Sequence, residues 1–487
     1  MQSFLNFSYA DIVVATVLVA SGSTAPAIAT EAPNAFPTFV RSQQNGVVIR
    51  AGDSGSTAPS AIAVHAVSAG LQLRMVHCDL DPVIGDGDDA LQVLRNIDML
   101  VNRIRALAAL EVDLVVVLSA FSNLDPTQTA YDKVFFPSSQ LAERGGSLRF
   151  DDPELPRGQL FARAARAIKR SAPNVRVYAW MPTLNFRLDR KAHHYAISKN
   201  SYVRSDLPQE QNDSTQYQRL SPFVGVVWDI VGEIYRDLGK ATGQYIDGIV
   251  FHDDAVITDQ EDVSPKAQAF LKNADWSALV PGDHRSWDQL DGAAQAIRKS
   301  RYLDQFTLHM VAQAQSAMNQ QFGLDKTLGT ARHVYSSAFS NPQAFRWLGQ
   351  EPASLLQDYD FLLVEAYPYM EARSVPGDAQ AGVTWCELEA REDCVTYSTT
   401  AYFDTLFDAV SAQPGGLDKV VFVMQTVDWN LRSGAVTDIA PDLIGQQMRA
   451  LYQRGTVHFG WYPDRYFQTD MHPQIVGEFD TILRQRR

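Results

Sequence analysis

Two adjacent carboxylates and a histidine end a short apolar tract, with His252-Asp253-Asp254 following Ile246 to Phe251. Paired carboxyl groups can hydrolyse a glycosidic bond, because one protonates the leaving oxygen and the other acts as nucleophile or base. The preceding tract contains β-branched residues and indicates a buried strand. Adjacent strand residues point to opposite faces, so one aspartate is expected to face a substrate while the other supports it. The simpler alternative is that one of them only caps the next helix.

Acidic and aromatic side chains follow the other apolar tracts in the same way. Glu371 is the favoured partner of Asp253 or Asp254 as a second catalytic carboxylate, with Asp79 and Asp81 also in contention. Sugar rings stack on Trp and Tyr and present hydroxyl groups to polar side chains, so we expect substrate contacts from a larger set. The set is Asp79, Asp81, Trp180, His252, Arg332, Glu365, Tyr367, Tyr369, Trp429, Trp461, Tyr462 and Asp464. Each could instead be a cap or a core residue, and only their shared position after the strands favours a binding face.

The order of apolar tracts and helical patterns predicts the fold. Strand-like tracts occur at 71–78, 112–119, 174–181, 246–251, 326–331, 360–366, 419–425 and 456–460. Amphipathic helical patterns lie between most of them, for example at 91–107, 159–169, 223–238, 293–318, 402–410 and 443–452. Eight strands alternating with helices predict an α/β protein of the (β/α)8 TIM-barrel type. The long connections 182–222 and 252–285 are expected to form the substrate cleft.

Residues 1–70 differ in composition from the predicted barrel, which occupies 71–487. An apolar run at 12–21, followed by Ala27-Ile28-Ala29, resembles a secretory signal, although no Lys or Arg precedes it. Residues 30–70 are rich in Ser, Ala, Gly, Thr and Pro and indicate a linker or a loosely ordered arm. The apolar run is too short for a comfortable membrane span. We therefore expect a periplasmic or secreted protein without a stable membrane span.

Charge and cysteine content narrow the function classes. The 487 residues carry a formal net charge of -14, which argues against nucleic-acid binding and suits a neutral or cationic polymer. Three cysteines without histidines at ligand spacing do not form a structural zinc site. Cys386 and Cys394 could form a local disulfide in an exported protein, whereas Cys78 is expected to be a buried small residue. No Gly-x-Ser-x-Gly elbow or Gly-rich phosphate loop is present, and we expect neither a metal nor a cofactor.

Several motifs resemble the C-terminal glycoside hydrolase domain of the PgaB family, periplasmic proteins that process poly-β-1,6-N-acetyl-D-glucosamine (PNAG) in biofilm formation. The most specific pieces are Phe251-His252-Asp253-Asp254-Ala255 and Tyr178-Ala179-Trp180-Met181-Pro182. The others, in the same order as in the family, are His77-Cys78-Asp79-Leu80-Asp81, Arg95-Asn96-Ile97-Asp98, Phe135-Phe136-Pro137, Arg219-Leu220-Ser221-Pro222-Phe223, Asp247-Gly248-Ile249-Val250, Thr330-Ala331-Arg332, Pro368-Tyr369-Met370-Glu371 and Tyr462-Pro463-Asp464.

The resemblance implies a (β/α)8 barrel that cuts partly deacetylated PNAG internally, with the polysaccharide as partner and the exopolysaccharide export machinery as a further candidate. It implies a catalytic aspartate at Asp253 or Asp254, a second acid at Glu371, and substrate ligands at Asp79 and Asp81. The family also carries a deacetylase domain before the barrel. The first 70 residues are too few for that domain and lack its paired His and Asp ligands, so we expect no deacetylase activity. The chain would then be a stand-alone hydrolase or a fragment.

Two other functions fit the same residues. A non-catalytic polysaccharide-binding or export module would keep the aromatic groove but would not cut the chain. A hydrolase of another amino-sugar polymer, such as a galactosaminoglycan, would keep the barrel and differ only in its groove contacts.

Overall fold

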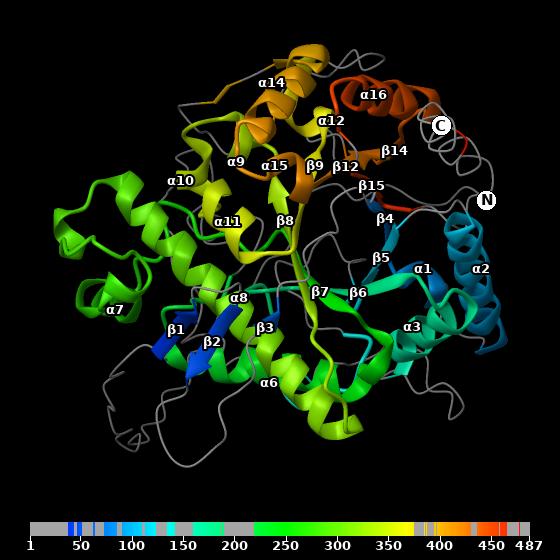
Figure 1. Ribbon diagram of the computed structural model, residues 1–487, viewed down its shortest axis with the longest axis horizontal. Coiled ribbons are helices and arrows are strands. Elements are labelled where there is room, and N and C mark those ends of the chain that lie inside the picture. Colours follow the sequence, from blue (N-terminus) through cyan, green and yellow to red (C-terminus); the bar gives the residue numbers. More distant parts are fainter. Residues whose placement is uncertain are drawn as a thin grey trace, which may run out of the picture. The chain divides into compact units, whose positions relative to one another are not determined.

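The computed structural model contains a closed barrel of eight parallel strands in the order β12-β15-β4-β5-β6-β7-β8-β9 (Figure 1). This is the (β/α)8 barrel predicted from the sequence. The structure describes residues 38–42, 46–50, 62–63, 73–84, 90–109, 113–122, 134–141, 159–186, 188, 219–374, 384, 386, 394–395, 397–429, 436–456, 458–464 and 477. All of them belong to one compact unit, Ala35–Arg487.

The barrel strands coincide closely with the eight predicted tracts. They are β4 (Leu73–Cys78), β5 (Asp113–Ser119), β6 (Arg176–Met181), β7 (Gly248–Phe251), β8 (Gly329–Tyr335), β9 (Phe361–Ala366), β12 (Val420–Gln425) and β15 (Phe459–Tyr462). The predictions for β8 and β15 start and end too early. Both strands carry polar or aromatic residues at their carboxyl ends, so an apolar tract alone does not show where the hydrogen-bonded ladder stops.

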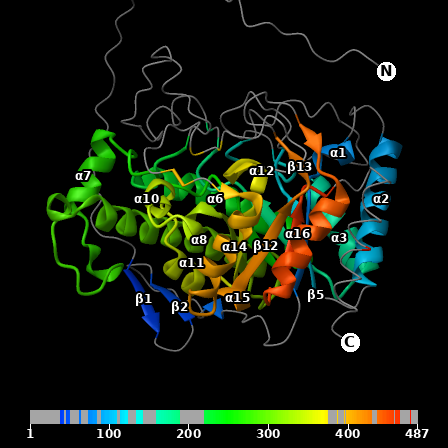
Figure 2. The same cartoon turned by 90° about the horizontal axis from the view of Figure 1, so that it is seen from above.

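Helices flank the barrel where helical periodicity was found. The longest are α2 (Ala90–Ala108), α3 (Leu160–Ser171), α6 (Gly225–Thr242), α8 (Gly292–Phe322), α14 (Thr399–Ser411) and α16 (Pro441–Gln453). Helix α8 begins where Asp291 accepts a hydrogen bond from the Ala294 backbone, and it ends at Gly323, whose φ of 63° suits glycine. Helices α14 and α16 pack against each other, and α16 also packs against β12 (Figure 2).

Alternate side chains of each strand enter two separate apolar layers. The inner layer fills the barrel and consists of Leu73, Met75, Val115, Val117, Phe121, Tyr178, Trp180, Val250, Ala331, Phe361, Leu363, Tyr367, Val421 and Val423. The outer layer packs against the helices and takes the intervening positions, such as Val116, Ile249 and Leu362. This two-residue alternation decides which polar residues at the strand ends face the barrel mouth.

A close approach inside the barrel requires two glycines. A Cβ atom on Gly248 would lie 2.2 Å from a ring carbon of Tyr178, and one on Gly329 would lie 2.2 Å from the Tyr178 hydroxyl oxygen. Any larger residue at either position would displace the Tyr178 ring, which fills the barrel beneath the site.

The two long connections and the N-terminal arm were also predicted from the sequence. The connection after β7 is described throughout and contains α7 (Pro265–Asn273), whereas only 182–186, 188 and 219–222 are described in the connection after β6. Within the arm at 30–70, the structure has three short antiparallel strands, β1 (Thr38–Ser42), β2 (Gly46–Arg50) and β3 (Ile62–Ala63). Their short β-branched stretches are hidden by the Ser- and Gly-rich composition around them.

Other predictions concern termini, cysteines and membrane spans. The signal-like run at 12–21 lies outside the described residues. Cys386 and Cys394 form a disulfide, and Cys78 is buried as a free thiol. Within the described part of the chain, no helix combines the length and the apolar character that crossing a membrane requires.

Candidate active site

A cavity of about 200 Å³ opens at the carboxyl ends of the barrel strands. Its lining consists of Trp180, His252, Asp253, His333, Glu365, Tyr367, Met370, Trp429 and Tyr462. Most of these residues continue the inner layer of their strands. Trp180 follows Tyr178, His333 follows Ala331 and Glu365 follows Leu363 at the two-residue spacing that keeps a side chain on one face.

Asp253 is the carboxylate that the β7 end delivers to this cavity. Its Oδ1 lies 2.6 Å from Nδ1 of His252, and its Oδ2 accepts a hydrogen bond of 3.2 Å from the Tyr335 hydroxyl. The Asp253 side chain is 21% exposed, whereas that of His252 is 5% exposed. Asp253 is therefore held on both oxygens and still reaches the cavity.

Electrostatics make Asp253 and His252 an ion pair. Burial alone raises the pKa of Asp253, but the charge and hydrogen bond of His252, with help from Tyr335, lower the pKa below its ordinary value. Burial alone lowers the pKa of His252, but the charge of Asp253 and hydrogen bonds with Asp253 and Asp254 raise that pKa to about 10. Both pKa shifts favour a cationic imidazole beside an ionised Asp253 at neutral pH.

Glu365 is in the opposite state. Burial, the nearby charge of Asp253 and the charge of Glu371 raise the pKa of Glu365 well above its ordinary value, and the His252 cation offsets only part of this. Glu365 Oε1 lies 3.3 Å from Nδ1 of His333. Burial lowers the pKa of His333 to about 3, so this imidazole is neutral. The cavity thus holds two carboxyl groups whose pKa values are shifted in opposite directions, upwards for Glu365 and downwards for Asp253, as acid–base catalysis by two carboxyl groups requires.

Asp254 lies outside the cavity lining and is completely buried. Its carboxylate accepts hydrogen bonds from three successive backbone N–H groups: Thr183 at 3.0 Å to each oxygen, and Leu184 at 2.8 Å and Asn185 at 2.6 Å to Oδ2. Three convergent amides form an anion-binding nest. Asp254 therefore fixes the start of the connection after β6 against the end of β7.

Aromatic rings surround the two acids. His77 packs edge-on against Trp180, with ring centroids 4.0 Å apart, and lies 4.4 Å from the Tyr462 ring. Trp429 stacks on Tyr462 at 5.9 Å and lies 5.6 Å from Tyr367. Among them, Trp429 and Tyr462 are half-buried and present ring surface to the cavity. Such surfaces suit the apolar C–H faces of a sugar.

The structure divides the sequence-predicted residues into two sets. Those that line the cavity are Trp180, His252, Asp253, Glu365, Tyr367, Trp429 and Tyr462. Those outside the lining are Asp79, Asp81, Asp254, Arg332, Tyr369, Glu371, Trp461 and Asp464.

Arg332 and Trp461 lie outside the cavity because they stand at strand positions whose side chains point towards the outer layer. Arg332 is fully buried, and its Nη1 donates to Asp304 Oδ1 at 2.7 Å while Nη2 donates to the Ala255 carbonyl oxygen. Trp461 belongs to the outer layer, and its Nε1 donates to Asp464 Oδ2 at 2.7 Å. Contact with a bound sugar is therefore blocked at Arg332 and Trp461 in this conformation.

The other residues outside the lining have local structural contacts. Asp464 also pairs with Arg103 at 3.0 Å. Asp81 accepts from the Ser122 hydroxyl at 2.6 Å at the start of α1 (Asp81–Ile84). Tyr369 and Glu371 lie in α12 (Pro368–Glu371), where the Tyr369 backbone donates to Gln425 and Glu371 is buried. Asp79 is half-buried between β4 and α1.

The expected substrate contacts included Arg332 but neither His333 nor Met370. For His333 a signal was present: it stands two residues after Ala331 in one strand, so it has the same parity as an inner-layer residue. The predicted strand stopped at residue 331, which removed that register. Met370 lies in a short helix after β9, where strand parity gives no guidance.

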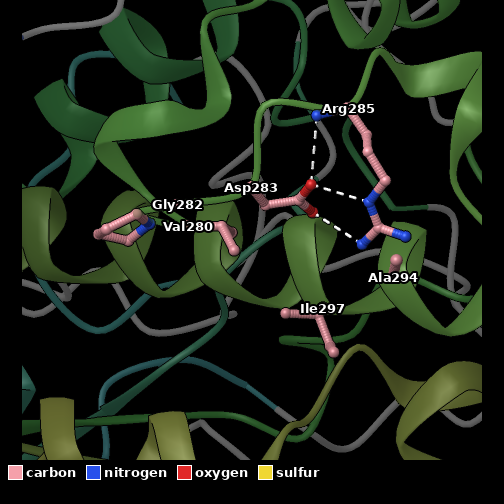
Figure 3. Close-up of a pocket in the computed structure, with 7 residues that line it drawn as sticks. Val280, Gly282, Asp283, Arg285, Ala294 and Ile297 are labelled. Carbon is pink, nitrogen blue, oxygen red and sulfur yellow. Dashed lines mark hydrogen bonds and ion pairs between the residues drawn. The ribbon is translucent and has the colours of Figure 1, made fainter.

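A second hollow lies between the 280–285 loop and α8, and its volume of about 430 Å³ is larger (Figure 3). Its two charged residues satisfy each other: Arg285 Nε and Nη2 donate to Asp283 Oδ1 and Oδ2 at 2.9 and 3.0 Å. No aromatic ring lines it. Of these two hollows, the barrel cavity is the one in which carboxyl groups and aromatic rings lie together. Across the described residues, no cluster of three His, Cys, Asp or Glu side chains could hold a metal ion.

Comparisons with known proteins concern the barrel as a whole. A family model, hypothetical glycosyl hydrolase family 13, matches residues 77–462. The chain is 28% identical over 410 residues to the poly-beta-1,6-N-acetyl-D-glucosamine N-deacetylases of Escherichia coli K12 and O157:H7, covering 84% of this chain and 52% of each relative. It thus spans about half the length of these curated relatives.

One solved structure is matched over almost its full length. The PgaB (BpsB) glycoside hydrolase domain from Bordetella bronchiseptica is 27% identical, with a TM-score of 0.62, and the match covers 84% of this chain and 97% of that domain. These similarities confirm the resemblance that the sequence motifs indicated.

Proposed function

The chain belongs to the hypothetical glycosyl hydrolase family 13 and is a glycoside hydrolase, and from this premise we propose that it cleaves partly deacetylated PNAG internally. The observation that carries the proposal is the pairing of ionised Asp253 with protonated Glu365 in one ring-lined cavity. Two carboxyl groups held in opposite protonation states are what hydrolysis of a glycosidic bond needs.

Glu365 is the proposed general acid. It gives its proton to the glycosidic oxygen as the bond from that oxygen to the anomeric carbon breaks, so the leaving sugar departs as an alcohol. Asp253 is the proposed second carboxylate, which either attacks the anomeric carbon or takes a proton from the water that attacks it. The His252 cation and the Tyr335 hydroxyl hold Asp253 for this step.

Asp254 and Glu371 are proposed to support these two groups. Asp254 anchors the end of β7 in the amide nest and so fixes the residue before it. Glu371 is buried, and its charge contributes to the raised pKa of Glu365. This assignment places the chemistry on Asp253 and Glu365, whereas the sequence favoured Asp253 or Asp254 with Glu371 and placed Glu365 among the substrate contacts.

The substrate class is supported by charge and by the relatives. The chain carries a formal net charge of -14 at pH 7. Removing acetyl groups from PNAG leaves ammonium groups, which a negatively charged protein attracts. An extracytoplasmic location is part of the proposal: the Cys386–Cys394 disulfide is typical of oxidising compartments, and the relatives are named for processing this polymer.

The test is cleavage of defined polymers by the full chain. We expect partly deacetylated PNAG to give a ladder of oligosaccharides by mass spectrometry, and we expect fully acetylated PNAG and a galactosaminoglycan to remain intact. Asp253→Asn and Glu365→Gln should each reduce cleavage at least about 100-fold. Asp288→Asn, on the surface with a side chain 70% exposed, is the matched control and should cut normally.

The arms of this experiment separate the alternatives. Cleavage of the galactosaminoglycan alone would transfer the function to another amino-sugar polymer. Binding of PNAG without any products from the wild-type chain would instead favour a binding or export module. Normal cleavage by both active-site variants would remove Asp253 and Glu365 from the chemistry.

A further inference from the structure

The barrel mouth contains a neutral imidazole that the proposed reaction does not yet use. We propose that His333 is a positioning residue for Glu365: it donates a hydrogen bond from Nδ1–H to Oε1 and thereby leaves the acidic proton on Oε2. This inference rests on the proposed function of Glu365 as general acid. Donation of a proton to the glycosidic oxygen is productive only when the proton sits on the oxygen that the substrate reaches.

The strand register brings the two side chains together. His333 lies on β8 and Glu365 on β9, and both belong to the face of the sheet that points into the barrel. Nδ1 and Oε1 are 3.3 Å apart, and both side chains are less than a tenth exposed. Hydrogen bonds between catalytic groups are commonly long without substrate and shorten when it binds.

The surroundings of His333 favour one tautomer of its neutral imidazole. Its Nε2 is buried and has no hydrogen-bond partner in the described part of the structure. A proton on Nε2 would therefore leave a buried N–H group without an acceptor, which proteins rarely tolerate. A proton on Nδ1 meets a carboxyl oxygen instead. We accordingly assign the neutral Nδ1–H form to His333.

Neighbouring rings hold the imidazole in this orientation. His77 lies 5.2 Å from His333, and Trp180 lies 5.8 Å from it, between ring centroids. The titratable groups that face His333 and Glu365 from the surrounding elements are His77, His252, Asp253, Tyr335, Tyr367, Glu371 and Tyr462. Of the three histidines, His252 alone carries the proton, because Asp253 is its immediate partner.

Three variants isolate the hydrogen bond. His333→Leu removes both ring nitrogens and keeps an apolar side chain of moderate size. His333→Gln keeps a polar side chain but places its amide near the former Nε2 position. His333→Asn places an amide N–H near the former Nδ1 position and should restore the donor.

Infrared spectroscopy reads the bond without relying on catalysis. The C=O stretch of protonated Glu365 is identified by its absence in Glu365→Gln. We expect this band to move to higher frequency in His333→Leu and His333→Gln, because Oε1 loses its donor, and to return towards the wild-type position in His333→Asn. Circular dichroism shows whether each variant is folded. One folded variant without the donor, either His333→Leu or His333→Gln, is enough for the test.

Kinetics on partly deacetylated PNAG provide the second readout. We expect kcat to fall about 10- to 100-fold in His333→Leu, with KM changed less than about threefold, and to recover in His333→Asn. A donor favours the ionised form of a carboxyl group, so its loss should also move the alkaline limb of the pH profile to higher pH.

The outcomes separate this inference from the proposed function. An infrared band at the same frequency in wild type and in a folded donor-free variant overturns the positioning role, whatever the activity. A loss of kcat that His333→Asn does not reverse, with an unmoved alkaline limb, overturns it as well. A wild-type chain that cuts no polymer contradicts the proposed function, while the band shift still decides whether His333 donates to Glu365.

Discussion

Substituting each of the two adjacent aspartates by asparagine should have opposite consequences. Asp254 accepts hydrogen bonds from three backbone N–H groups, at Thr183, Leu184 and Asn185, and it is completely buried. A hydrogen bond to a charged group contributes about 1.5–3 kcal/mol, and one to a neutral group about 0.5–1.5 kcal/mol. The change to asparagine therefore costs about 1 kcal/mol for each donor, or about 3 kcal/mol of unfolding free energy.

Urea unfolding followed by tryptophan fluorescence measures this loss, since the chain has eight tryptophans. Activity of Asp254→Asn should be reduced mainly in proportion to its folded fraction. Asp253→Asn should lose cleavage at least about 100-fold even when fully folded. Added formate should restore part of the activity of Asp253→Ala, because the vacated site opens to a cavity of about 200 Å³. Formate should not rescue Asp254→Ala, whose carboxylate site is closed to solvent.

The reverse pattern would refute this reasoning. If folded Asp254→Asn were inactive at wild-type stability, and Asp253→Asn cut normally, the reacting carboxylate would be Asp254. The backbone nest would then describe a resting state that the substrate must open.

Three further predictions follow from the buried charges. The cleavage rate should increase with pH as Asp253 ionises, at a pH below the ordinary pKa of an aspartate. It should decrease only where Glu365 loses its proton, at a pH above the ordinary pKa of a glutamate. Initial rates that decline near the ordinary glutamate pKa would contradict the assignment. The pKa of His252 is about 10 when folded and 6.5 in the ordinary state, so its ion pair stabilises the protein fully below about pH 6.5 and is lost as pH rises through about 10. Thermal unfolding across this range should show that loss in the wild type and much less of it in Asp253→Asn. Arg332→Leu should lower the unfolding free energy by about 3–5 kcal/mol at high pH, because Asp304 keeps its hydrogen bonds from Ser354 and Tyr359 but loses its counter-ion. The loss should be smaller at low pH, where Asp304 is neutral, since burial raises the pKa of Asp304 to about 7. Adding Asp304→Leu should recover most of the loss in urea titrations, and equal stability of wild type and single variant would show that the pair contributes nothing.

The fold could be predicted because its signal is repeated eight times. Each strand is a short apolar tract buried on both faces, and most are followed by a helical pattern, so errors of a few residues at individual ends did not change the count. The uncertain part was the register at the strand ends. There, apolar residues give way to polar ones, and composition no longer shows which residues remain in the ladder.

That register decides which predicted residues meet in the cavity. Glu365 continues the inner face of β9, whereas Arg332 and Trp461 continue outer faces. Applying the alternation from the apolar part of each strand would have removed Arg332 and Trp461 from the expected site. It would also have added His333, two positions after Ala331.

The choice between Asp253 and Asp254 could not be made in this way. Both follow the end of β7, where the chain has left the strand, so parity supplies only the expectation that they diverge. What distinguishes them is a partner remote in sequence, the run of amides at 183–185, which offers no charged or motif-like residue. Backbone nests depend on local dihedral angles and are therefore invisible to reasoning from side-chain types.

The five residues from Phe251 to Ala255 each have a separate task, which explains why this short stretch is so specific. Phe251 packs in the outer layer, His252 is the counter-ion, Asp253 faces the cavity, Asp254 enters the nest, and the Ala255 carbonyl accepts from Arg332. The other four residues hold Asp253 in place. A carboxylate held in one orientation before the substrate arrives loses little freedom during the reaction, so its support contributes to rate as well as to stability. The buried polar contacts around the site are thus the means by which this barrel keeps a single aspartate in position.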